Sequence, residues 1–122
     1  VLALGALVVL ALNPASDLFM TTAIFVVIGL TGGSYGLLMA HGRAFLPPEL
    51  TGRGVTLLNF FSIGGVGLIQ FATGGVVAAA TVPDDPVQAY VALFGFYAVL
   101  MAVALAIFLF AKDARPEQTT KI

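Results

Sequence analysis

The chain has 122 residues, of which 60% are hydrophobic and only 9% are charged, and its mean hydropathy is +1.08. Soluble proteins carry about 25% charged residues, so this chain cannot cover the surface of a soluble domain and is expected to lie in a lipid bilayer. Its net charge of -1 excludes a basic nucleic-acid-binding surface, and zero Cys with one His excludes Cys-based and multi-His metal sites. We therefore expect no nucleic-acid partner, no metal and no cofactor.

The first apolar segment, residues 1–12, is shorter than a membrane span. A spanning helix needs about 20 residues to cross a hydrocarbon core of ~30 Å. No basic region precedes the segment, which disfavours a secretory signal peptide, although a signal-like leader remains an alternative. The simplest interpretation is a truncated transmembrane helix at 1–12, in a chain that is a fragment of a longer protein.

Three further segments are long enough to span. No charged residue occurs in 18–40, 54–83 or 86–111, and the apolar runs are continuous rather than alternating, which favours helices over barrel strands. We predict helices at 17–41, 50–81 and 87–111, followed by a polar tail at 112–122. The connections at 13–17 and 83–86 are short, which predicts antiparallel neighbours. Ser16 or Asp17 can cap the second helix, and Asp84 or Asp85 the last.

The positive residues predict the orientation of these helices. Arg43 and Arg53 lie in the connection after the second helix, and the remaining three lie in the tail: Lys112, Arg115 and Lys121. In an antiparallel arrangement, all of them fall on one side of the membrane. The positive-inside rule makes that side, and with it the C-terminus, cytoplasmic.

The predicted helix at 17–41 has two unlike faces on a wheel of 100° per residue. One face carries small residues at helix-packing spacing, namely Gly29, Gly32, Gly33 and Gly36. The opposite face carries Thr31, Ser34 and Tyr35. Ordinary helix packing explains the glycine face, and a locally unwound segment at Gly32-Gly33 is the alternative. The polar face either lines a cavity or makes interhelical hydrogen bonds.

The predicted helix at 50–81 carries a polar stripe. Asn59, Ser62, Gln70 and Thr73 fall within about 80° of arc on the same wheel, and Gly67 and Gly74 flank them as packing positions. Amides cost free energy in hydrocarbon unless they are hydrogen-bonded, so this stripe faces protein or water rather than lipid. Gln70 either lines a pathway or bonds a neighbouring helix, and the second interpretation is favoured for Asn59. The helices at 1–12 and 87–111 are plain and apolar.

The connection at 41–54 carries a family resemblance. It reads His-Gly-Arg-Ala-Phe-Leu-Pro-Pro-Glu-Leu-Thr-Gly-Arg-Gly and leads into Asn59 and the Gln70 helix. It resembles the cytoplasmic loop between the tenth and eleventh helices of a bacterial major facilitator superfamily transporter, which often has Pro-x-x-x-x-Gly-Arg there, as at 47–53. The resemblance covers 1–122. It implies an all-α membrane protein with part of helix nine and all of helices ten to twelve, antiparallel, in a twelve-helix bundle in the bacterial inner membrane.

The resemblance also implies functional positions. Thr31, Ser34 and Tyr35 would face the substrate path, with Gln70 and Asn59 as further candidates on the eleventh helix. The loop candidates Arg43, Glu49 and Arg53 would act as cytoplasmic gate and loop contacts, or simply as positive-inside anchors. Glu49 and Arg53 could pair if the helix begins before them.

The leading prediction is therefore a fragment of a secondary active transporter that moves a small solute by alternating access. Its partners would be the bilayer, the remaining helices of the same transporter and a small-molecule substrate. The alternative is a small stand-alone membrane protein, either a partner-stabilising subunit or a homo-oligomeric exporter. An enzyme is disfavoured, because the Gly-x-Ser-x-Gly pattern at 32–36 lacks a strand–turn–helix context and the only His is seven residues from Ser34.

Overall fold

A computed structural model of the chain describes residues 1–13 and 17–111, and all of its regular elements in these residues are helical. The α-helices are α1 (Leu2–Leu12), α2 (Leu18–Thr31), α3 (Tyr35–Arg43), α4 (Thr51–Ala80) and α5 (Val87–Leu109). Two short 3₁₀ turns, η1 (Gly32–Ser34) and η2 (Pro48–Leu50), precede α3 and α4. The spans Leu18–Arg43, Pro48–Ala80 and Val87–Leu109 contain 26, 33 and 23 residues and are long and apolar enough to cross a membrane. The prediction of an all-α chain with three full spans is confirmed in the described residues.

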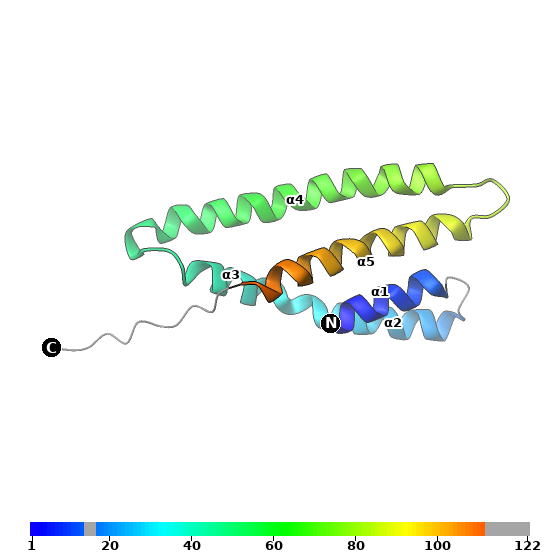
Figure 1. Cartoon of the computed structure of the whole chain (residues 1–122), viewed down its shortest axis with the longest axis horizontal. Coiled ribbons are helices and arrows are strands. Elements are labelled where there is room, and N and C mark those ends of the chain that lie inside the picture. Colours follow the sequence, from blue (N-terminus) through cyan, green and yellow to red (C-terminus); the bar gives the residue numbers. More distant parts are fainter. Residues whose placement is uncertain (14–16, 112–122) are drawn as a thin grey trace.

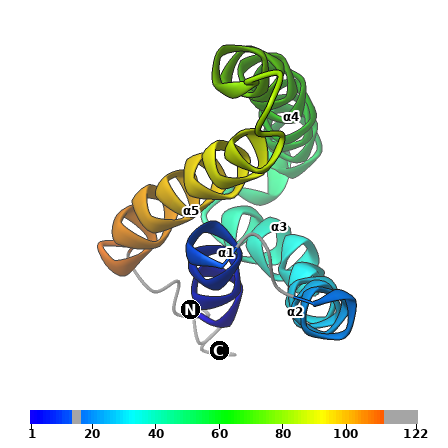
Figure 2. The same cartoon turned by 90° about the vertical axis from the view of Figure 1, so that its right-hand side faces the viewer.

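The helices run antiparallel in an open row. α1 packs between α2 and α5, and α5 packs between α1 and α4. Figure 1 shows the end of α1, the start of α2 and the α4–α5 connection at one end of the molecule, and the α3–α4 connection at the other. Figure 2, along the bundle, shows α4 and α2 on opposite sides of the row. The plain helices α1 and α5 thus lie between α2 and α4, whereas α3, the second half of the span that begins with α2, packs directly on α4.

Carboxylates lie at the start of two helices. Asp17 is the N-cap of α2 and accepts a hydrogen bond from the Met20 amide at 2.7 Å, which satisfies one orphan amide of the first turn. The N-cap of α5 is Pro86, and Asp85 before it accepts a hydrogen bond from the Val87 amide at 3.1 Å. The alternative cap Ser16 lies outside the described residues, as do the tail 112–122 and its three positive residues. The observed helix ends lie within two residues of the predicted ones, except for the interruption at η1.

The described residues bury very little apolar surface. Only Leu10 and Ala98, from α1 and α5, are buried side chains. Large side chains face outward on every helix; Phe19, for example, is 84% exposed and Phe71 is 87% exposed. Because exposed apolar area is unfavourable in water, these faces must be covered by lipid or by other helices.

Candidate functional site

The span Leu18–Arg43 is interrupted at η1, past its middle. Thr31, the last residue of α2, turns its hydroxyl back onto the carbonyls of Val27 and Ile28 at 3.1 and 2.9 Å. Such back-bonding competes with the regular helix and often bends it. Two glycines of low helix propensity follow, and the chain tightens there into a 3₁₀ turn. These features do not suffice alone, because α4 stays regular through Gly64-Gly65 and the back-bonded Ser62. The turn lies about 14 Å from Arg43 along the axis at 1.5 Å per residue, and therefore within the apolar part of the span.

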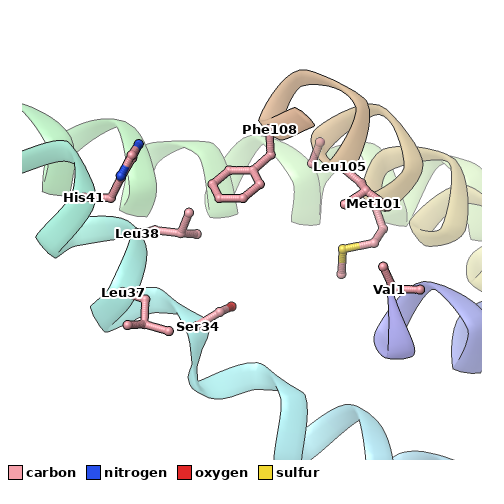
Figure 3. A pocket seen from close by; sticks show the side chains of 9 residues that line it. Val1, Ser34, Leu37, Leu38, His41, Met101, Leu105 and Phe108 are labelled. Atoms are coloured by element: carbon pink, nitrogen blue, oxygen red, sulfur yellow. The ribbon is translucent and has the colours of Figure 1, made fainter. Parts of the chain in front are cut away.

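Ser34, the last residue of this turn, lines an open groove between α3 and α5. The groove has a volume of about 620 Å³ and starts beside Val1, in line with α1, so residues that continued α1 before Val1 would occupy it. Figure 3 shows Ser34, Leu38 and His41 of one wall facing residues of α5. The lining residues on α5 are Met101, Ala104, Leu105 and Phe108. Ser34 and His41 are the polar side chains of an otherwise apolar surface, which suits contact with lipid or with another helix as well as with a small molecule.

Tyr35 and Asn59 join the two polar helices. The Tyr35 hydroxyl donates a hydrogen bond to Asn59 Oδ1 at 2.5 Å, linking the start of α3 to the third turn of α4. Tyr35 is 51% exposed and Asn59 is half-buried. Of the two interpretations for these residues, the geometry in the described part of the chain is that of an interhelical hydrogen bond.

The other members of the α4 stripe differ in their bonding. The Ser62 hydroxyl bonds back to the Leu58 carbonyl at 2.9 Å, and the Thr73 hydroxyl to the Ile69 carbonyl at 2.7 Å. Gln70 is exposed, and its amide has no hydrogen-bond partner among residues 1–13 and 17–111. Within the same residues, the Ser34 hydroxyl is also unpaired. Among the candidates for the substrate pathway, Gln70 and Ser34 are thus the two whose side chains make no hydrogen bond in the described residues. Their polar groups remain available to another helix, to water or to a solute.

The six candidate packing glycines have no close neighbour in the described structure. A Cβ added at any of them would meet nothing within 4 Å; they are Gly29, Gly32, Gly33, Gly36, Gly67 and Gly74. Close contacts occur instead at Gly42, against the side chain of Leu58, and at Gly54, against the side chain of Leu46. Neither Gly42 nor Gly54 was predicted as a packing position, because a contact across the α3–α4 connection has no helical spacing to reveal it. The packing role of the six glycines stays a prediction about helices that cover them.

The loop candidates lie together at one end of the bundle. Arg43 ends α3, Glu49 lies in η2 and Arg53 lies in the first turn of α4, all exposed. Within residues 17–111, Glu49 and Arg53 form no ion pair. His41 packs its ring against Phe45 at 5.1 Å and Phe108 at 6.3 Å between centroids. No group of three His, Asp or Glu in the described residues could hold a metal ion.

Sequence reasoning missed the contribution of Tyr97, on the plain helix α5. Its hydroxyl lies 3.2 Å from Thr73 Oγ1 and so connects α5 to the polar stripe of α4. It also lines a second open groove of about 670 Å³, rich in aromatic side chains such as Phe25, Tyr90 and Phe94. A lone Tyr in an apolar helix gives no sign of which neighbour it meets.

The chain matches no family model, no curated protein and no solved structure.

Proposed function

We propose that the chain is part of a secondary active transporter of the major facilitator type. It moves a small solute across the bacterial inner membrane by alternating access, and its C-terminus is cytoplasmic. The observation that carries the proposal is the interruption of an apolar span at Gly32–Ser34, with polar side chains gathered beside it. The antiparallel order of the helices, with Arg43 and Arg53 at one end, agrees with the proposed orientation.

The 3₁₀ turn supports transport as a weak point within a span. It keeps helical backbone angles, so a bilayer tolerates it, but its hydrogen-bond geometry is poorer than that of an α-helix and such turns often mark hinges. Transporters place more strongly broken helices at their binding sites. Ser34 lies at the turn, and Gln70 on α4 holds an amide that hydrocarbon cannot satisfy.

The exposed apolar faces support a larger assembly. With only two buried side chains, the described helices hold almost no core of their own. In a transporter, other helices of the same protein cover the faces that lipid does not. A stand-alone subunit or homo-oligomer is the second candidate, since a partner protein would cover the same faces.

A labelling experiment on the full-length protein tests the transport proposal. The chain contains no Cys, so Ser34→Cys introduces a single reactive thiol into this part of the protein. In sealed vesicles of both orientations, a membrane-impermeant maleimide is expected to label it from either side. Val103→Cys, on a 52% exposed position of α5 that lines neither groove, is the control and stays unlabelled. A Ser34→Cys variant that resists the reagent from both sides would refute a solute pathway at the turn.

The coding sequence upstream of Val1 separates the two candidates. About eight further apolar segments of spanning length in the same frame would support the twelve-helix transporter. A start codon within a few residues of Val1 would favour the small subunit or homo-oligomer instead.

A further inference from the structure

We draw no further inference here: the strongest candidate, the aromatic-rich groove lined by Phe25 of α2, Ile69 of α4 and Phe94 of α5, carries none, because nothing in the part of the chain that the structure describes shows whether lipid or another helix covers it.

Discussion

Thr73 and Tyr97 join α4 to α5 through their hydroxyls, which lie 3.2 Å apart. The Thr73 hydroxyl has one proton, and the Ile69 carbonyl at 2.7 Å is the nearer acceptor. Tyr97 is therefore the donor of the interhelical bond, and Thr73 accepts it with a lone pair. The bond satisfies the Tyr97 hydroxyl, since the Thr73 hydroxyl is already bonded to the Ile69 carbonyl.

Removing the Tyr97 hydroxyl is expected to weaken this helix pair modestly. Tyr97→Phe and Thr73→Val should each lower the thermal midpoint of the protein in detergent, with a coupling energy of about 0.6 kcal/mol, as is typical between transmembrane helices. A double-variant cycle measures that coupling. Fully additive losses would show that the two hydroxyls are not bonded in the membrane.

The spans of this fold could be predicted from the sequence because charge is excluded from hydrocarbon. The uncharged runs located three helices, and Asp17 and Asp85 marked where two of them begin. The partners of each helix could not be predicted in this way. Whether α2 packs on α1 or on α4 depends on how apolar faces of similar composition fit together, and nothing in their residue pattern distinguishes them.

The candidate site was predictable in residue type but not in arrangement. Gly32-Gly33 raised the possibility of an unwound turn, and the structure has a 3₁₀ turn there, whereas the pair Gly64-Gly65 in α4 stays α-helical. The bond between Tyr35 and Asn59 spans 24 positions and depends on the rotation of both helices, which no local pattern encodes. Tyr97 was missed for the same reason.

Gly54 provides a test of the α3–α4 connection. A Cβ there would lie 3.0 Å from Leu46 Cγ and closer still to both Leu46 Cδ atoms, so the leucine must move. The flexible end of Leu46 can move aside, and alanine favours the helix by about 1 kcal/mol, so the two effects oppose each other and Gly54→Ala alone should change the thermal midpoint little. In a Leu46→Ala background the clash is absent and only the helix propensity remains, so Gly54→Ala should raise the midpoint there. An equal effect of Gly54→Ala in both backgrounds would contradict this packing.

The orientation in the membrane is testable with two single Cys variants. Ala44→Cys lies in the α3–α4 connection and Asp84→Cys in the α4–α5 connection, and both positions are exposed. With Arg43 and Arg53 held in the cytoplasm, an impermeant maleimide applied to intact cells should label Asp84→Cys only. Ala44→Cys should react after permeabilisation. The opposite pattern would invert the proposed topology.

The η1 turn can be straightened by one substitution. Alanine at Gly33 meets no neighbour within 4 Å and favours the α-helix by about 1 kcal/mol, so Gly33→Ala should reduce the flexibility of the turn and slow transport. Gly75→Ala, in the uninterrupted part of α4, gains the same propensity and is the control. Transport rates normalised to protein level compare the two. A loss of protein level in Gly33→Ala would instead point to a helix packed tightly against that glycine.

Gln70 is the most direct test of a pathway on α4. Its amide is exposed and, in the described residues, has no hydrogen-bond partner, so a solute or water is free to use it. Gln70→Leu in the full-length protein should reduce transport several-fold while membrane levels stay near normal, because the apolar side chain costs nothing in a lipid or protein environment. Gln88→Leu, the same change at an exposed position in the first turn of α5, should leave transport unchanged. If Gln70 instead bonds a neighbouring helix, Gln70→Leu lowers the thermal midpoint and the protein level together, and transport per molecule stays near that of the unaltered protein. Measuring transport and level on the same membranes separates these results, since a pathway residue changes the rate and a packing residue changes the amount.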